Sequence, residues 1–409
     1  MSADGTKPTG AGDVGTHVHP IPTELLTINV GPAHPATHGT LRLQLQLDGE
    51  TIVNAGAEIG YLHRGYEKQA ENCFYQLVIP YAERLNYMGP VNNSNAWCYA
   101  LEQLLGIEAP PRAQALRVIT SEMGRIIDHA VCMGTNLVDL GALTNFWYMY
   151  NYREKIYDLY EELTGARMMV NYPRIGGVSQ DAPDGWFESL LKVADEMGEA
   201  VGDVRALIAK NRIFMDRTQG VGVITKEQAV SHSVTGPCLR ATGIPYDVRK
   251  AQPYWGYDKY QFDVPTAEGG DTYDRFMVRF AEMEQSIRII KQAINQIQDG
   301  PVMVEDHLVS MPTKDKVYNT MEGLINHFKL VMHGIRPPKG EIYSATEGGN
   351  GELGFYIVSD GSPTAWRVRV RPPCFANYSV FPKIITGGMV ADAVAALGSI
   401  NIIAGELDR

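Results

Sequence analysis

The sequence predicts an α+β protein in which a central helical bundle lies between two small antiparallel sheets. Hydrophobic residues alternate with period two near the N-terminus, recur with period 3.6 through the middle, and alternate again near the C-terminus. The chain has 409 residues, of which 44% are hydrophobic, so it can bury a large core. These observations favour this fold class over a doubly wound parallel sheet.

The first predicted sheet is a hairpin near the N-terminus. Residues 41–47 alternate strictly between leucine and a polar residue, which indicates a half-buried strand. Asp48 and Gly49 form a hairpin turn signal, and residues 51–59 follow as the partner strand. Residues 1–24 contain neither an apolar signal core nor an arginine-rich amphipathic pattern, so we expect a flexible arm on a protein that stays inside a bacterial cell.

The middle of the chain predicts the helices of the bundle. A long helix follows Pro111, with apolar residues at helical spacing, and Thr144 is the expected N-cap of a helix that stops at Gly165. Further helices are expected at 186–210, from 272 to about 299 after an N-cap at Asp271, and at 316–332. We expect the segments 112–163 and 271–332 to form the bundle.

The C-terminal part returns to strands. Residues 354–358 and 366–370 flank a turn at 359–362, and a short helix is expected near 389–397. These patterns divide the chain into four regions. They are the arm at 1–24, an N-terminal sheet with its loop at 25–68, a helical core at 69–338, and a C-terminal hairpin, helix and tail at 339–409.

Charge and cysteine content exclude several classes of protein. Acidic residues outnumber basic ones by 47 to 36, whereas a nucleic-acid-binding protein usually has the opposite balance. No apolar run is long enough to cross a bilayer, so we expect a protein that is not integral to a membrane; attachment to a membrane surface stays open. The five cysteines form no C-x-x-C pair, which argues against disulfides and against a metal site ligated by this chain alone.

Residues 349–354 (GNGELG) match the G-x-G-x-x-G pattern of dinucleotide sites. That site needs the glycines between a strand and the start of a helix, but strand-like residues lie on both sides here. We therefore expect a turn. The sequence contains no Walker loop, nucleophile elbow or H-E-x-x-H motif, so it does not support binding of NADH or ATP, or simple hydrolysis.

Four polar residues are candidates for chemistry. His34 and His38 stand four residues apart, but the prolines and glycines around them exclude the regular helix that would turn both toward one metal. The loop leaves two interpretations for them: ordinary surface histidines, or a rigidly held proton donor. Tyr87 and Asp139 stand among apolar residues, and Asp139 is either a helix-end acid or a functional partner.

Six ungapped segments together carry a resemblance that no single motif carries. They are residues 29–39 (NVGPAHPATHG), 59–68 (IGYLHRGYEK), 174–178 (RIGGV), 262–265 (FDVP), 356–361 (YIVSDG) and 406–409 (ELDR). In this order they resemble the 49 kDa-type (D-type) core subunit of respiratory complex I, a family related to the large subunit of nickel–iron hydrogenases. The resemblance covers about residues 25–409 and implies a hydrogenase-large-subunit-like α+β fold.

The resemblance implies a function in a proton-pumping NADH:quinone oxidoreductase. The chain would bind no cofactor alone, hold the headgroup of the substrate quinone, and pack against a small iron–sulfur subunit that carries the terminal 4Fe-4S cluster. The other implied partners are a 30 kDa-type subunit, a ferredoxin-like two-cluster subunit and a membrane subunit that forms the quinone channel. We expect a peripheral location on the cytoplasmic side of the bacterial inner membrane.

The resemblance also implies roles for individual residues. His38 and Tyr87 would hydrogen-bond the quinone headgroup, and Asp139 would hold His38. Imidazole and phenol can each donate a proton to a quinone that is being reduced. The other implied pocket positions are Thr135, Ile403 and His34. The implied cluster-proximal positions are Arg84 and Met169.

There are three alternatives to this function. A hydrogenase-type subunit would need two cysteine pairs, but the aligned positions are Asn86, Gly89, Ile403 and Glu406. A ferredoxin-linked relative of complex I would use the same quinone residues. A non-catalytic scaffold would have no reason to keep them. The chain also departs from the family at two positions, with Asn86 where relatives usually have Asp and Met169 where many have His, and methionine cannot titrate.

Overall fold

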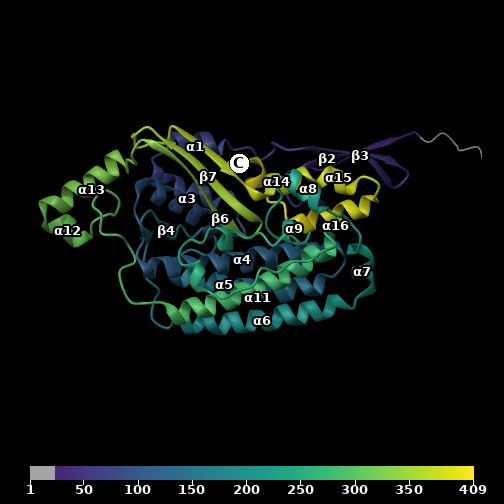
Figure 1. The fold of residues 1–409 in the computed structure, drawn as a ribbon, viewed down its shortest axis with the longest axis horizontal. Helices are drawn as coiled ribbons and strands as arrows, with labels where there is room; N and C mark the ends of the chain where they lie inside the picture. Colours follow the sequence, from purple (N-terminus) through teal and green to yellow (C-terminus); the bar gives the residue numbers. More distant parts are fainter. Residues whose placement is uncertain (1–23) are drawn as a thin grey trace, which may run out of the picture.

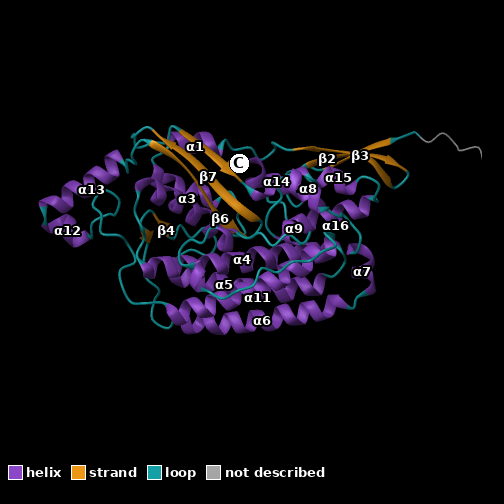
Figure 2. Cartoon of the chain, in the orientation of Figure 1, coloured by secondary structure: helices purple, strands orange, loops and turns teal. Residues whose placement is uncertain are grey.

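The computed structural model describes residues 24–409, and the predicted arm lies almost wholly outside this range. Figure 1 shows a layer of long helices along one side of the molecule, with the strands and many of the shorter helices on the other side. Figure 2 shows the strands gathered into separate small sheets rather than one large sheet. The predicted α+β class is confirmed.

The N-terminal sheet consists of β1 (Leu26–Val30), β2 (Arg42–Asp48) and β3 (Thr51–Glu58), paired antiparallel in that order. The alternating leucines of β2 turn one face of the sheet into the core, which confirms the predicted hairpin. Strand β1 is an addition to that prediction. The loop between β1 and β2 contains the 3-10 helix η1 (Pro35–Thr37).

Four long helices form the bundle: α4 (Pro111–Asp139), α5 (Leu143–Thr164), α6 (Trp186–Ala209) and α11 (Thr272–Gln296). Asp271 caps α11 by accepting the amide of Asp274 at 2.8 Å, and Gly165 ends α5 with a positive φ, as predicted. The prediction of Thr144 as an N-cap is wrong. The cap position is Ala142, because a short turn after α4 lets α5 begin at Leu143.

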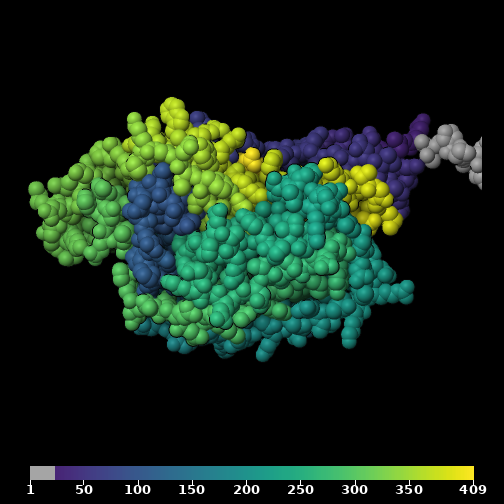
Figure 3. All heavy atoms as spheres, viewed as in Figure 1, coloured from purple at the N-terminus to yellow at the C-terminus, as the bar shows by residue number. Residues whose placement is uncertain are grey.

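The segment 316–332 does not join the bundle, which corrects the prediction. It forms two helices, α12 (Lys314–Asn319) and α13 (Met321–His333). Thr320 ends α12 with an extended backbone and then caps α13 by accepting the amide of Gly323 at 3.1 Å. The pair projects from one end of the molecule, as the left side of Figures 1 and 3 shows.

The C-terminal sheet pairs β6 (Gly340–Gly348), β7 (Gly351–Ser359) and β8 (Arg367–Arg371) antiparallel. The predicted hairpin of 354–370 is therefore confirmed, and β6 is an addition to it. The G-x-G-x-x-G segment lies at the β6–β7 turn and in β7, as expected from its strand-like flanks. The predicted helix near 389–397 is α16 (Val390–Ile400).

Shorter helices connect these elements. They are α1 (Tyr66–Asn72), η2 (Tyr75–Val78), α2 (Ile79–Glu83), α3 (Pro90–Leu105), α7 (Arg212–Thr218), α8 (Lys226–Ser231), α9 (Pro237–Arg240), α10 (Val248–Ala251), η3 (Tyr257–Lys259), α14 (Pro373–Ser379), α15 (Phe381–Ile385) and α17 (Ala404–Asp408). The two-residue strands β4 (Pro173–Arg174) and β5 (Gly177–Val178) form a further small sheet.

The C-terminal residues are tied to the N-terminal part of the chain. The carboxylate of Asp408 accepts the backbone amides of Gly60 and Leu62, each at 2.8 Å. This contact holds the residues after α16 against the segment that follows β3, and so helps to fix one side of the site described below. Among residues 24–409, no helix has the length and apolar character needed to span a bilayer.

Candidate functional site

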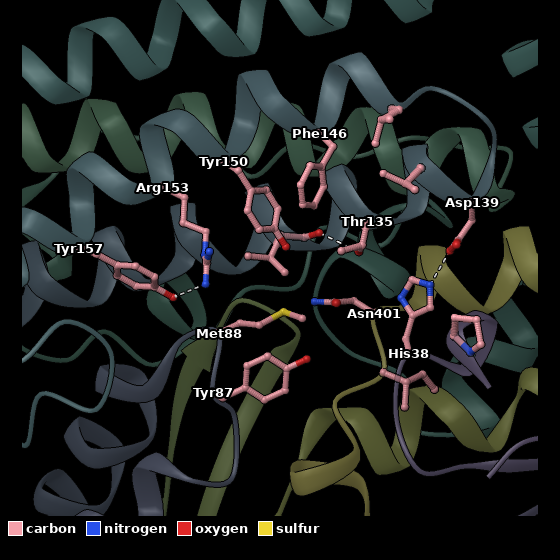
Figure 4. Close-up of a pocket in the computed structure, with 15 residues that line it drawn as sticks. His38, Tyr87, Met88, Thr135, Asp139, Phe146, Tyr150, Arg153, Tyr157 and Asn401 are labelled. Carbon is pink, nitrogen blue, oxygen red and sulfur yellow. Dashed lines mark hydrogen bonds and ion pairs between the residues drawn. The ribbon is translucent and has the colours of Figure 1, made fainter. Parts of the chain in front are cut away.

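A cavity of about 410 Å³ opens where α4, α5, the η1 loop, the α2–α3 turn and the residues after α16 meet. His38, Tyr87 and Asp139 all line it, although they are far apart in the sequence (Figure 4). The structure therefore brings together the three residues to which the family resemblance assigns the quinone headgroup. The geometry agrees with the prediction; the chemical roles of the three residues are a separate proposal.

The loop before β2 fixes the position of His38. The hydroxyl of Thr37, which is buried, donates to the carbonyl oxygens of His34 at 2.7 Å and Gly39 at 2.8 Å. His38 itself adopts a left-handed backbone with φ of 54°. Its Nε2 lies 2.5 Å from Oδ2 of Asp139, the last residue of α4. Such a short contact holds the imidazole in one orientation.

Tyr87 projects from the turn between α2 and α3. The turn is held by Asn86, whose side-chain oxygen accepts the amides of Met88 at 2.9 Å and Gly89 at 3.3 Å. Tyr87 keeps 42% of its surface exposed. Nevertheless, protein atoms around its hydroxyl raise the pKa of Tyr87 above 10, and the carboxylate of Asp128 adds to this increase. The phenol is therefore protonated at neutral pH.

A buried polar cluster lies behind the cavity wall. Asp128 accepts the side-chain amides of Asn401 at 2.6 Å and Asn86 at 3.0 Å, and Asn401 itself lines the cavity. The carboxylate of Glu406 lies 3.3 Å from the thiol of Cys374. Burial raises the pKa of Glu406 to about 7, with Asp128 contributing in the same direction. Asn86 and Glu406, two of the positions compared above with hydrogenase cysteines, are thus parts of one cluster.

Helix α5 supplies a side of the cavity that the sequence did not predict. The rings of Phe146 and Tyr150 stack at 3.8 Å between centroids, and the guanidinium of Arg153 lies between Tyr150 and Tyr157 (Figure 4). These four residues follow helical spacing, so they share one face of α5. That periodicity could have identified them as a group, but it could not have shown that the face borders a cavity.

The remaining predicted residues take different places. Thr135 lines the cavity one turn before Asp139 on α4. Ile403 is buried behind the wall, which its neighbours Asn401 and Ile402 form. His34 is exposed and its Nδ1 accepts the amide of Ala36, so it supports the loop and does not line the cavity.

The two positions predicted beside a partner's cluster, Arg84 and Met169, do not line the cavity. Arg84 is about half exposed and its Nη1 donates to the carbonyl of Pro80 at 2.8 Å. Met169 is partly buried in the segment after α5. In the part of the chain from residue 24 onward, no group of three or more His, Cys, Asp or Glu side chains could hold a metal ion.

Comparison with known proteins decides the family. The model of the respiratory-chain NADH dehydrogenase 49 Kd subunit matches residues 139–409. The chain belongs to this family. The C/D subunit of the NADH-quinone oxidoreductase of Bdellovibrio bacteriovorus is 52% identical over 94% of this chain and 69% of its own length. The D subunit of the Myxococcus xanthus enzyme is 46% identical over 95% of this chain and 93% of its own.

A third relative supports the same assignment over nearly the full length of both proteins. The D subunit of the NADH-quinone oxidoreductase of Methylacidiphilum infernorum is 48% identical over 94% of this chain and 92% of its own length. The matched region of the 49 Kd subunit family includes Asp139 and α5, whereas His38 and Tyr87 lie before it. The relatives match nearly the whole chain. The resemblance stated from the sequence is thereby confirmed.

Proposed function

We propose that this chain forms the quinone headgroup site of a proton-pumping NADH:quinone oxidoreductase and takes part in two-electron, two-proton reduction of the quinone. The observation that carries the proposal is the meeting of His38, Tyr87 and Asp139 at one cavity. The names of the relatives, which are NADH-quinone oxidoreductase subunits, favour NADH over ferredoxin as the donor for the whole complex.

The residue types suit this reaction. A quinone that receives two electrons also needs two protons, and the Tyr87 phenol and the His38 imidazolium can each donate one. The Asp139 carboxylate would hold the imidazole ring toward the cavity. Because hydrogen bonds formed by Thr37 and Asn86 hold the loop and the turn that carry the two donors, both would be oriented before the quinone arrives.

The proposal extends to the assembly. Electrons would come from a 4Fe-4S cluster in a small iron–sulfur subunit packed near Arg84. The other partners would be a ferredoxin-like two-cluster subunit, a membrane subunit that forms the quinone channel, and a 30 kDa-type subunit. The C/D name of the Bdellovibrio relative, which is longer than this chain, supports the last of these. In the complex, the chain would lie peripherally on the cytoplasmic side of the inner membrane. Its fold would be hydrogenase-large-subunit-like.

Tyr87→Phe tests the proposal in the assembled complex. The substitution keeps the ring and removes one hydrogen-bond donor, so quinone reduction should fall roughly a hundredfold, as loss of such a donor costs about 2–4 kcal/mol. Reduction of an artificial acceptor from NADH should not change. Tyr356→Phe is the matched control, because its hydroxyl bonds Glu341 at 2.6 Å on the C-terminal sheet. Wild-type quinone reduction in an intact Tyr87→Phe complex would contradict the proposal.

A further inference from the structure

Arg153 lies at the same cavity as the proposed proton donors. In Figure 4 it stands with Tyr157 on one side of the cavity, while His38 and Asp139 stand on the other side and Tyr87 and Asn401 lie between them. The cavity therefore has two polar ends, of which one is an imidazole–carboxylate pair and the other a guanidinium. The guanidinium is charged at every physiological pH.

Several contacts hold the Arg153 side chain in place. Its guanidinium carbon lies 4.8 Å from the ring centroid of Tyr150 and 4.6 Å from that of Tyr157. One Nη donates to the Tyr157 hydroxyl at 3.1 Å and the other to Glu154 at 3.2 Å. The Nε atom is buried and has no hydrogen-bond partner in the described structure, so one donor of this group remains unused.

The residues around Arg153 leave much of its positive charge without a neutralising partner. Glu154, its carboxylate partner, is 46% exposed and is shared with Arg167, so it neutralises Arg153 only in part. Much of the cavity wall is apolar, which strengthens electrostatic effects inside it. The apolar lining residues include Met88, Val131, Leu143, Phe146 and Ile402.

Arg153 also acts on Tyr87 through space. Its positive charge opposes the increase in the pKa of Tyr87 that burial and Asp128 produce. A cation that makes the phenol easier to deprotonate stabilises the phenolate, which is the state of Tyr87 after it has donated its proton. Arg153 therefore bears on the same proton transfer that the proposed function assigns to Tyr87.

We infer that the guanidinium of Arg153 supplies the positive charge of this cavity. That charge stabilises the negative charge that develops on the quinone oxygen and on Tyr87 during quinone reduction. The inference rests on the proposed function and adds to it a residue that acts on the reduction step. It does not require Arg153 to donate a proton or to bind the neutral quinone.

The reduction step is balanced in atoms and electrons. Under the proposed function the two electrons would reach the quinone from the partner iron–sulfur subunit, and the O–H bond of Tyr87 would break as a new O–H bond forms on one quinone oxygen. Tyr87 is left as a phenolate beside the Arg153 cation. The imidazolium of His38 protonates the other oxygen, which gives the quinol, and solvent protons then restore Tyr87 and His38.

Arg153→Gln and Arg153→Lys in the assembled complex test the inference, with decylubiquinone as the probe. Since the neutral quinone carries no charge, Arg153→Gln should lower kcat about tenfold or more while KM stays within about twofold. The solvent deuterium isotope effect on kcat should increase, because proton transfer becomes slower. Arg153→Lys keeps the charge and should recover most of kcat. Lys155→Gln, on the same helix, is the control, since Lys155 pairs with Glu196 and does not line the cavity.

Three results would overturn the inference: a kcat near wild type in Arg153→Gln, an increase in KM without loss of kcat, or equal damage in the Gln and Lys variants. If Arg153→Gln does not assemble, Tyr157→Phe decides, because it frees the guanidinium from its hydroxyl partner and keeps the ring. A threefold lower kcat with a larger isotope effect would support the inference, and an unchanged kcat would contradict it. Tyr87→Phe in the same assay separates the proposed function from the inference about Arg153. If Tyr87→Phe impairs quinone reduction and Arg153→Gln does not, only the inference about Arg153 fails.

Discussion

His38 depends on two supports that the sequence keeps 101 positions apart, the η1 loop and the end of α4. The loop sets the backbone through the Thr37 hydroxyl, and Asp139 sets the ring through a contact of 2.5 Å. The imidazole–carboxylate pair is only partly exposed, with side-chain exposures of 16% and 21%, so the charge of Asp139 acts in a weakly screened environment.

Asp139→Asn separates the charge of this residue from its geometry. The amide can still hydrogen-bond the imidazole, but it carries no negative charge beside the ring, so we expect quinone reduction to fall about tenfold. His38→Ala should be more harmful, because it removes a donor and leaves the carboxylate without its partner. NADH-driven reduction of an artificial acceptor, measured beside quinone reduction, should stay at the wild-type level in both. Equal activities in Asp139→Asn and wild type would show that the charge has no part in the reaction.

Glu406 should make the stability of the protein depend on pH. Its pKa rises from 4.5 to about 7 in the folded state, so the neutral side chain is tolerated below about pH 4.5 and the charged one destabilises the fold as pH rises through 7. The difference amounts to about 3 kcal/mol at most. Glu406→Gln should therefore reduce the loss of thermal stability of the complex between pH 5.5 and 8. The exposed Glu341→Gln serves as the control, and an unchanged loss in Glu406→Gln would refute this effect.

Single residues show what the sequence could and could not predict about the site. The roles of His38, Tyr87 and Asp139 follow from the family resemblance, because composition and spacing alone leave each of them with a plain structural explanation. Arg153 was missed, since an arginine beside Glu154 on an amphipathic helix looks like a solvated surface pair. Ile403 is buried behind the cavity wall that Ile402 helps to line, because which of two adjacent apolar residues faces a cavity depends on the backbone turn at Asn401.

At the scale of elements, the η1 loop depends on a glycine that nothing can replace. Gly31 has φ of +90°, and a Cβ added there would lie 1.9 Å from the carbonyl oxygen of Leu41. Any side chain must therefore push the loop away from β2 or change its path. Since His38 follows seven positions later on the same loop, its distance to Asp139 would change as well.

Gly31→Ala should accordingly impair quinone reduction at least tenfold without loss of electron entry into the complex. The matched control is Gly49→Ala at the β2–β3 turn, where φ is +63° and no atom lies within 4 Å of an added Cβ. It carries a similar backbone strain of about 1 kcal/mol without the clash, and should keep near-normal activity. If both variants lose activity equally, strain and not the position of the loop explains the result.

The elements that were predicted correctly are those with a strong local pattern. Strand β2 alternates strictly, and α4 keeps helical spacing along its whole length. Strand β1 alternates over only five residues, which is a weak signal, and the residues of β6 do not alternate, so pairing with β2 and β7 is what identifies both as strands. The predicted position of α13 in the bundle is wrong for a related reason. Its apolar residues predict burial in the bundle, but the break at Thr320 and the irregular segment before it place α13 outside.

At the scale of the whole molecule, the α12–α13 helix pair exposes an apolar stripe. Met321 is 76% exposed, Phe328 57% and Met332 55%, at helical spacing on α13, and Tyr318 on α12 is 82% exposed. A row of large apolar side chains on one projecting helix face is typical of a surface that becomes buried in an assembly. The stripe therefore supports the expectation that the chain alone is incomplete.

We predict that the isolated chain associates with itself in solution and does not reduce quinone. Exposed apolar area drives association, and both the stripe and the open cavity lack cover when the chain is alone. Light scattering of the purified chain at increasing concentration should show species larger than 45.2 kDa. Replacing Phe328 and Met332 by serine should reduce this self-association, and in the cell it should also reduce incorporation of the chain into the complex. The paired control replaces Lys329 and Asn326 by serine, which changes the same helix without altering the stripe. A stable monomer that reduces quinone would contradict the prediction, because it would show that neither surface needs a partner.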